Sequence, residues 1–318
     1  MDIDKRIKAF TLLREFLNRF RSEPSRPEFE ELNNAIQLAE RNNAWFTKGN
    51  IIDSLNAIAS FLNEKSLRDW LSKYSLQNEA EKKVGVIMAG NIPMVGFHDM
   101  MCVLLSGNVF VGKLSSNDAF LIPALTKKLS EFEPEFKDRI IFTERLKDFD
   151  AVIATGSNNT ARYFEYYFGK YPHIIRKNRN SIAILNGKET QDELKSLGKD
   201  IFQYFGLGCR NVSKLYVPES FDFTNLLDAF NQYSNIAKSS KYFNNYEYHK
   251  AIYLVNRVPH LDTGFLLVKE DPSLHSPIAV LHYEVYTDEK KLKEEILSKE
   301  QEIQCVVTNQ NLDLRGMD

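Results

Sequence analysis

The sequence has few cysteines, no long apolar run and almost no net charge. The three cysteines, Cys102, Cys209 and Cys305, include no Cys-x-x-Cys pair, and the six histidines are scattered. This spacing argues against a disulfide framework and against a zinc site. No apolar stretch approaches the roughly 18 residues that a membrane helix needs. Because the first ten residues, MDIDKRIKAF, are also charged, we expect no membrane span and a cytoplasmic protein.

The charge balance makes nucleic acid an improbable partner. Lysine and arginine total 41 against 43 acidic residues, which gives a net charge of −2 in 318 residues. Binding to a phosphate backbone needs clustered basic side chains, and stretches such as 176–179 are too short for it. A hydrophobic fraction of 43% with 26% charged residues is typical of a globular chain with material for about two domains.

Residues 1–83 are predicted to form a helical N-terminal segment. Apolar residues recur at steps of three and four from Ile3 to Phe20, which places them on one face of an amphipathic helix. Pro24 and Pro27 end this helix, and the pattern resumes over 29–38 and 51–71. We interpret this segment as part of the structure and not as a targeting signal.

From residue 84 onward short apolar runs alternate with longer helical patterns, which is typical of βαβ units and parallel sheets. Strands are expected at 84–88, 109–111, 140–143, 151–154 and 181–185, and helices at 97–106, 119–130, 158–167 and 193–205. A second series follows, with strands at 212–217, 265–268, 279–286 and 305–308, helices between 223 and 255, and a solvated helix face at 290–299. The predicted fold class is α/β, with parallel-sheet domains at 84–205 and 206–318.

The first candidate site residue is Asn91, which lies in the loop after the strand at 84–88. In open α/β sheets, ligands bind where strands end and helices begin. A neutral amide held at this point can donate a hydrogen bond to a developing oxyanion. Alternatively, Asn91 is a turn residue that tolerates unusual backbone angles.

Two further strand ends carry groups that suit a cofactor phosphate. Lys113 and the Ser115 hydroxyl follow the strand at 109–111, where they can bind a phosphate or a ribose hydroxyl. Gly156 and Ser157 lie between the strand at 151–154 and a helix, whose free N–H groups attract anions. Alternatively, Lys113 is an exposed strand-end lysine and Ser157 caps an ordinary helix. Because neither a G-x-G-x-x-G nor a Walker motif occurs, dinucleotide binding would have to be atypical.

Cys209 is the candidate nucleophile. Gly206 and Gly208 allow the backbone before it to approach a ligand closely. Backbone N–H dipoles and Arg210 are expected to favour the thiolate. The alternative is a buried structural cysteine, which is how we interpret Cys102 in an apolar helix and Cys305 in a strand.

Four segments taken in order resemble the aldehyde dehydrogenase superfamily, and most closely its acyl-CoA reductase branch, the fatty-acid reductase family of bacterial luminescence. They are AGNIPMVGFHD at 89–99, VGKLSSND at 111–118, ATGSNNTARYF at 154–164 and FGLGCRNVSKLYVP at 205–218. The resemblance covers about residues 84–308. It implies a cofactor domain, a catalytic domain and a small oligomerisation element, and therefore a possible homo-oligomer.

The resemblance also implies roles for the candidate residues. Asn91 matches the oxyanion-hole asparagine, and Lys113 matches the lysine that contacts the ribose and phosphates of the cofactor. Gly156 and Ser157 match the pair under the pyrophosphate, while Cys209 matches the nucleophile. The reductase branch uses NADPH, although NADH stays possible, and no metal is implied.

Three departures from the family pattern bear on the reaction. The hydrolytic members carry Glu-Leu-Gly-Gly-Lys, whose Glu activates water, whereas this sequence has Ile-Arg-Lys-Asn-Arg at 175–179. Loss of that base favours reduction of an acyl-CoA over oxidation of an aldehyde. Ser273 replaces the ribose-binding Glu, and the nearby His275 could stack on the nicotinamide, donate a proton or simply be an exposed loop residue. The sequence stops at Asp318, so a C-terminal segment normal to the family is expected to be short or missing.

The expected function is therefore NADPH-dependent reduction of a fatty acyl-CoA to the aldehyde through an acyl group on Cys209. The alternatives are an acyl-phosphate or semialdehyde reductase and a non-catalytic binding or assembly protein. An acyl-transferring or ligating subunit is a possible partner implied by the resemblance. The acyl chain length stays open, because the aromatic run at 163–168 fits an acyl tunnel as well as core packing, which is our preferred interpretation.

Overall fold

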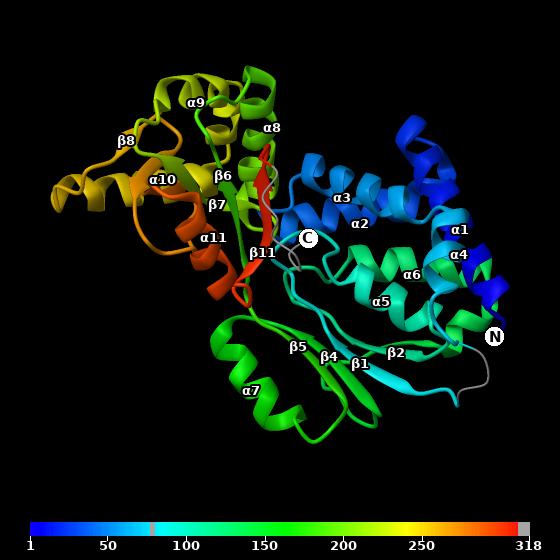
Figure 1. Cartoon of the computed structure of the whole chain (residues 1–318). Helices are drawn as coiled ribbons and strands as arrows, with labels where there is room; N and C mark the ends of the chain where they lie inside the picture. Colours follow the sequence, from blue (N-terminus) through cyan, green and yellow to red (C-terminus); the bar gives the residue numbers. More distant parts are fainter. Residues whose placement is uncertain (77–79, 311–318) are drawn as a thin grey trace. The chain divides into compact units, whose positions relative to one another are not determined.

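The computed structural model describes residues 1–76 and 80–310. The chain divides into two compact units, Met1–Lys177 and Asn178–Asp318, which are described in turn. Both are α/β units built on mainly parallel sheets, and the first begins with a helical segment, as the sequence predicted (Figure 1). Among the described residues, no helix has both the length and the apolar character needed to cross a membrane.

The first unit contains a parallel five-stranded sheet with the order β3-β2-β1-β4-β5. The strands are β1 (Lys83–Ile87), β2 (Val109–Lys113), β3 (Ile140–Phe142), β4 (Ala151–Thr155) and β5 (His173–Arg176). The helices that follow them are α5 (Phe97–Leu105), α6 (Leu121–Phe132) and α7 (Asn158–Phe168). The strand order reverses between β1 and β4, and this switch point is where open α/β sheets bind ligands.

The N-terminal helices belong to the same core as this sheet. They are α1 (Ile3–Ser22), α2 (Glu30–Asn42), α3 (Lys48–Phe61) and α4 (Glu64–Leu71), with a 3-10 turn at Pro27–Phe29. Phe10 of α1 is fully buried, and its ring lies 6.4 Å from that of Phe97 and 5.9 Å from that of Phe136. The helical segment predicted for residues 1–83 is therefore a layer packed on α5 and α6 (Figure 1).

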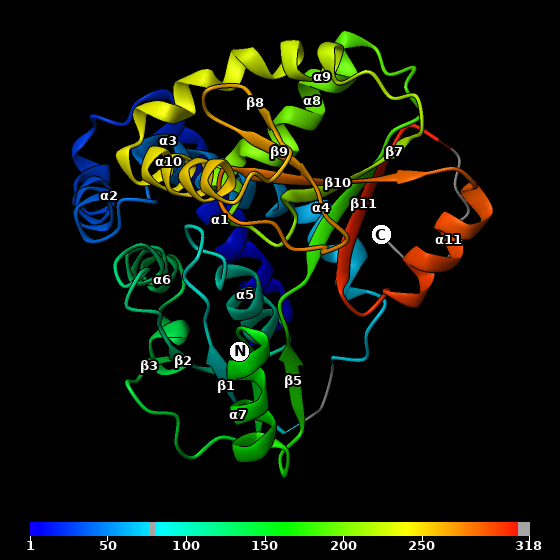
Figure 2. The same cartoon turned by 90° about the vertical axis from the view of Figure 1, so that its left-hand side faces the viewer.

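The second unit contains a six-stranded sheet with the order β11-β6-β7-β10-β9-β8, parallel except for the pair β8 and β9. The strands are β6 (Asn180–Ile184), β7 (Val212–Pro218), β8 (Leu261–Asp262), β9 (Leu267–Glu270), β10 (Val280–Tyr286) and β11 (Ile303–Thr308). The helices are α8 (Gln191–Phe202), α9 (Phe223–Phe230), α10 (Ser240–Val255) and α11 (Glu289–Ser298). Leu215 and Val217 of β7 pack in the cluster with α8 and α9, whereas Tyr216 packs in the cluster with α11. Helices α8 and α9 thus lie on one side of this sheet and α11 on the other (Figure 2).

The division between the units lies earlier in the chain than the predicted boundary near Gly206. The reason is that β6 pairs with β7 and with β11, so the strand expected at 181–185 belongs to the second sheet. Sequence analysis also missed β5, which is largely exposed, and β8, which has only two residues. The helix expected at 290–299 is α11, but it buries Leu292 and Ile296 and so is not a fully solvated element.

Candidate active site

The loop after β1 presents Asn91 at the carboxyl edge of the first sheet. Asn91 is exposed, whereas Gly90 before it and Pro93 after it are buried. A Cβ atom at Gly90 would lie 2.3 Å from the Ser115 Oγ, so only glycine fits the close approach of the two loops here. Asn91 is therefore exposed at the surface although Gly90 and Pro93 in the same loop are buried.

Lys113 is the last residue of β2 and Ser115 lies in the loop after it, and the two have different surroundings. Lys113 is exposed and forms no ion pair with a carboxylate in the described part of the chain. Ser115 is half-buried, and its Oγ accepts a hydrogen bond of 3.3 Å from the Asn117 N–H. The Lys113 amine is therefore available to an anion, while the Ser115 hydroxyl lies between the two loops.

Gly156 and Ser157 connect β4 to α7. The Ser157 hydroxyl caps α7 by accepting a hydrogen bond of 3.2 Å from the Thr160 N–H, as the alternative interpretation of this residue predicted. A Cβ atom at Gly156 would lie 3.0 Å from Thr160 and from Phe164, which leaves no room for a larger residue without adjustment. Ser157 thus binds its own helix, and the first backbone N–H groups of α7 lie at the carboxyl edge of the sheet.

These three loops fit a dinucleotide cofactor. Because β1, β2 and β4 are parallel neighbours, their carboxyl ends lie along one edge, which includes the switch point between β1 and β4. An exposed amine at Lys113 and a glycine before a helix N-terminus at Gly156 are groups that bind phosphate. The structure brings together Asn91, Lys113 and Gly156 on one edge of the first unit.

In the second unit, Cys209 lies in a tight turn that precedes β7. Three consecutive residues, Tyr204, Phe205 and Gly206, have φ angles of 52°, 59° and 75°, which ends the helical region. The Asn211 side chain then accepts a hydrogen bond of 2.8 Å from the Gly208 N–H. The same side chain donates one of 2.9 Å to the Asp200 carbonyl. Cys209 is exposed on this clamped turn.

Ser181, near the start of β6, is hydrogen-bonded to the turn of Cys209. The Ser181 hydroxyl is buried, donates to the Cys209 carbonyl at 2.9 Å and lies 2.8 Å from the Cys305 Sγ. Nearby, His275 is exposed and its Nδ1 lies 3.3 Å from the Asn180 Oδ1. The Ser181 hydroxyl therefore contacts both the Cys209 backbone and the Cys305 thiol, while His275 contacts the neighbouring Asn180.

Charges around Cys209 favour the thiolate as expected, and burial of the thiol opposes them. Partial burial raises the pKa of the Cys209 thiol above its ordinary value, and the nearby thiol of Cys305 acts in the same direction. The guanidinium groups of Arg210 and Arg179 lower the pKa but do not outweigh burial. Cys209 is thus accessible, as a nucleophile must be, but it is mainly a neutral thiol near pH 7.

The segment at 175–179 has a structural role in place of the missing base. Arg176 Nη1 donates to both oxygens of Asp99, at 2.6 Å and 2.7 Å, and so pairs β5 with the first turn of α5. Asp99 is buried and is held by this ion pair. At the position where the family's hydrolytic members carry a water-activating Glu, this chain has Ile175, and the arginine that follows it is already paired.

The aromatic residues of α7 do not pack as expected. Tyr163, Tyr166 and Tyr167 are 66%, 83% and 62% exposed, so core packing is wrong for these three side chains. Their position on the surface gives no support to an acyl tunnel either. Phe164 and Phe168 are half-buried and supply the apolar face of the helix.

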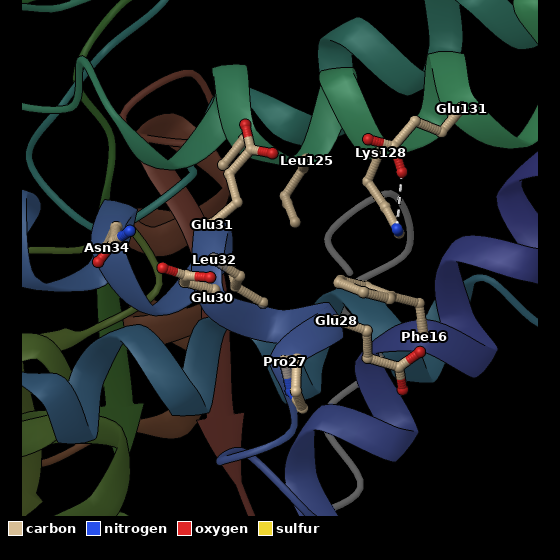
Figure 3. Close-up of a pocket in the computed structure, with 11 residues that line it drawn as sticks. Phe16, Pro27, Glu28, Glu30, Glu31, Leu32, Asn34, Leu125, Lys128 and Glu131 are labelled. Atoms are coloured by element: carbon tan, nitrogen blue, oxygen red, sulfur yellow. Dashed lines mark hydrogen bonds and ion pairs between the residues drawn. The ribbon is translucent and has the colours of Figure 1, made fainter.

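A cavity of about 360 Å³ lies among α1, α2 and α6 and contains none of the predicted site residues (Figure 3). Phe16, Leu32 and Leu125 form its apolar part, and several glutamates surround it. Lys128 pairs with Glu131 at 2.7 Å and lies 4.9 Å from the centre of the Phe16 ring. The one lysine of the lining is therefore already paired, and we assign the cavity no ligand.

Sequence reasoning missed the residues that hold the two candidate loops. Ser181 and Asn211 fix the turn of Cys209, and Asp118 accepts a hydrogen bond of 2.6 Å from the Met94 N–H in the loop of Asn91. One signal was available for Ser181, a polar residue within an otherwise apolar strand. Asn211 and Asp118 had no comparable signal, because their partners are set by the fold.

Solved structures similar to this chain are aldehyde dehydrogenases. A putative aldehyde dehydrogenase from Burkholderia cenocepacia has 14% identity and a TM-score of 0.68 over 98% of this chain and 76% of its own. An indole-3-acetaldehyde dehydrogenase in complex with NAD⁺ has 13% identity and a TM-score of 0.70, over 98% and 77%. A variant aldehyde dehydrogenase from Pseudomonas syringae, in complex with NAD⁺ and octanal, has 12% identity and a TM-score of 0.66 over 98% of this chain and 78% of its own. At these identities the similarity shows the fold alone, and it defines the class as aldehyde dehydrogenase-like.

The family follows from the sequence itself. A model of the acyl-CoA reductase (LuxC) family matches residues 14–228, more than half of the chain. A search of curated proteins found no match. The chain belongs to the acyl-CoA reductase (LuxC) family, which confirms the resemblance seen in its motifs, and it is an oxidoreductase that acts on acyl or aldehyde groups.

Proposed function

We propose that this protein reduces a fatty acyl-CoA to the aldehyde with NADPH, through a thioester on Cys209. The observation that supports it most is an exposed thiol on a turn clamped by Asn211, in a chain of the acyl-CoA reductase family. A nucleophilic cysteine needs this combination of access and fixed position.

The nicotinamide cofactor is proposed to bind at the carboxyl edge of the first sheet. Lys113, Gly156 and the first N–H groups of α7 would hold its phosphates. When bound, the cofactor supplies the hydride. Two similar aldehyde dehydrogenases contain NAD⁺, whereas the preference for NADPH rests on the family resemblance, so both forms are to be compared.

The proposed acyl transfer to the protein uses Cys209 and Asn91. The Cys209 thiolate attacks the thioester carbon and forms a C–S bond, while the bond to the CoA sulfur breaks and CoA leaves as a thiol after taking a proton. Negative charge develops on the carbonyl oxygen during this step, and the Asn91 amide donates a hydrogen bond to it. After reduction, the bond to Cys209 Sγ breaks, the aldehyde leaves and the thiolate is regenerated. The proposal therefore requires Asn91 and Cys209 to act on one carbonyl group.

The absence of a base in 175–179 supports reduction over hydrolysis. This stretch carries no carboxylate, and Asp99, which contacts it, is bound by Arg176. An acyl group on Cys209 would then meet no side chain from this stretch that removes a proton from water. Such a group would persist until it accepts hydride.

The test is to incubate the protein with octanoyl-CoA without cofactor and to locate the acyl group by mass spectrometry. We expect one acyl group on Cys209, none in Cys209→Ala, and unchanged labelling in the matched variants Cys102→Ala and Cys305→Ala. Acylation that survives Cys209→Ala would refute the nucleophile. Labelling by an acyl phosphate but not by the CoA thioester would point to the acyl-phosphate reductase instead. If neither substrate labels the protein and NADPH does not bind, a binding or assembly role is favoured.

A further inference from the structure

One peptide group in the loop of Asn91 is held at both of its polar atoms. The Pro93 carbonyl accepts a hydrogen bond of 2.7 Å from the Ser54 hydroxyl of α3. The Met94 N–H, which belongs to the same peptide group, donates one of 2.6 Å to Asp118 Oδ2. Ser54 and Asp118 are 7% and 3% exposed, so both bonds are sheltered from water.

The backbone at this point needs such support. Met94 has a φ angle of 57°, a left-handed conformation that is unfavourable for any residue with a Cβ atom. Two residues before the held peptide, Asn91 extends from the buried loop to the surface. A loop that orients a hydrogen-bond donor has to be fixed to within a fraction of an ångström. The two hydrogen bonds to the 93–94 peptide, from Ser54 and to Asp118, fix this loop.

Among the described residues, the Asp118 carboxylate has one hydrogen-bond partner, the Met94 N–H. Its second oxygen, Oδ1, is buried and has no hydrogen-bond partner among the described residues. A buried carboxylate with one partner is costly, and the charged acceptor forms a stronger bond to an N–H group than a neutral one does. The bond to Met94 is therefore the interaction that this carboxylate makes.

We propose that Asp118 and Ser54 are positioning residues that hold the 93–94 peptide and thereby aim the Asn91 amide at the acyl oxygen. This inference rests on the proposed role of Asn91. It also gives the N-terminal helices a part in the reaction, because Ser54 comes from α3. The adjacent loop is held from the same layer, since the Asn42 side chain of α2 donates to the Ser116 carbonyl at 2.8 Å.

The test measures the single-turnover rate of Cys209 acylation by octanoyl-CoA. Asp118→Ala and Ser54→Ala should each lower this rate by about 10- to 100-fold, since a misplacement of about 1 Å costs up to roughly 10²-fold. Asp118→Asn, which keeps an acceptor for Met94, should stay within about threefold of the natural protein. The affinity for NADPH should not change. Thr126→Val is the matched control, because this buried hydroxyl donates only to Pro123 of its own helix region, at 2.9 Å.

A double-mutant cycle separates positioning from general destabilisation. In an Asn91→Ala protein the donor is already gone, so adding Asp118→Ala should lower the rate by less than about threefold. If the rate reductions of Asn91→Ala and Asp118→Ala multiply fully in the double mutant, the inference is wrong. A Ser54→Ala protein that acylates at the natural rate would also overturn it. If Asp118→Ala does not fold, Ser54→Ala with and without Asn91→Ala gives the same cycle. If Asn91→Ala itself acylates normally, the proposed function fails at Asn91, a result distinct from failure at Asp118.

Discussion

The reactivity of Cys209 depends on two opposing influences at the scale of single residues. Cys209 is exposed as a residue, which allows attack, but neighbouring atoms partly bury its thiol, and this burial raises the pKa of the thiol and limits the thiolate near pH 7. Arg210 and Arg179 act in the opposite direction. Acylation should therefore become faster as pH rises and level off above the pKa of Cys209, which lies above the ordinary value for cysteine.

Replacing Arg210 with Ala should slow the modification of Cys209. Loss of the positive charge raises the pKa of the thiol further, so the thiolate fraction near pH 7 should fall severalfold. The measurement is the rate of alkylation by iodoacetamide at Cys209, followed by mass spectrometry from pH 6 to 9. Arg210→Lys should keep most of the natural rate. Equal rates for Arg210→Ala and the natural protein at every pH would exclude this electrostatic effect.

Asp118 gives a pH-dependent contribution to stability. Burial raises its pKa to about 6 from an ordinary 3.8, against the opposing hydrogen bond from Met94. A folded-state pKa above the unfolded value means that the folded protein binds the proton more tightly, so stability falls as pH rises from about 4 to 6. At pH 7.5 the buried anion then costs about 3 kcal/mol relative to acid conditions.

Asp118→Asn should therefore gain stability relative to the natural protein as pH rises. The free energy of unfolding of the variant minus that of the natural protein should be more favourable at pH 7.5 than at pH 4.5 by about 2 kcal/mol. Urea denaturation at the two pH values measures this difference. Comparing two pH values cancels the constant cost of burying the new amide. A difference that does not change with pH would contradict a raised pKa at Asp118.

The residues that sequence analysis found and missed differ in one physical respect. Asn91, Lys113 and Cys209 follow or precede strands beside glycines, so their neighbours in the chain indicate a site. By contrast, Ser181 acts on Cys209, 28 residues away in sequence, and Ser54 acts on Pro93, 39 residues away. A hydrogen bond between distant residues leaves no local pattern, so the supporting residues could not be predicted.

At the scale of elements, the loops after β1 and β2 fit together through a glycine. A Cβ atom at Gly90 would meet the Oγ of Ser115 at 2.3 Å and its Cβ at 2.6 Å. Neither atom is at the end of a long flexible side chain, so the loops would have to move apart. Because one loop carries Asn91 and the other carries Lys113, this contact sets the spacing of both candidate groups.

Gly90→Ala should thus destabilise the protein, by about 1–3 kcal/mol, as overpacking commonly does. Adding Ser115→Gly removes both close contacts and should restore part of the loss. Gly49→Ala is the matched control. Gly49 lies in helix α3, and a Cβ atom there would have its nearest neighbour at 3.9 Å. Urea denaturation of the four proteins tests this. Equal stability of Gly90→Ala and Gly49→Ala would show that the loops tolerate the added methyl group.

The ends of elements were harder to predict than their existence. The apolar pattern predicted a helix over 193–205, but α8 ends at Phe202 and Tyr204 and Phe205 adopt positive φ angles. Asn211 bonds to the Asp200 carbonyl and thereby pulls the chain into the turn of Cys209. Tertiary hydrogen bonding overrides the local preference for helix at this point.

At the scale of the whole molecule, each unit has its own buried core among the described residues. The first core joins α1 to α4 with α5, α6, β1 and β2, while the second unit has one cluster on each face of its sheet. The sequence predicted both the helical segment and the sheets, but it separated the helices from the sheet they cover. Amphipathic periodicity shows that a helix has a buried face and does not show which element covers that face.

Phe10→Ala should destabilise the first unit as a whole, although Phe10 lies in the N-terminal helical layer. The ring is fully buried between Phe97 and Phe136, and truncation of such a side chain typically costs about 3–5 kcal/mol. Hydrogen exchange of the amides in β1 and β2 should then become about a hundredfold faster, because their protection depends on the shared core. Phe230→Ala, which removes an equally buried ring beside Phe202, is the matched control and should instead affect β7 and β10. If Phe10→Ala accelerated exchange only within α1 to α4, these helices would unfold independently of the sheet. The hydrogen bond from Ser54 could then not be expected to fix the loop of Asn91.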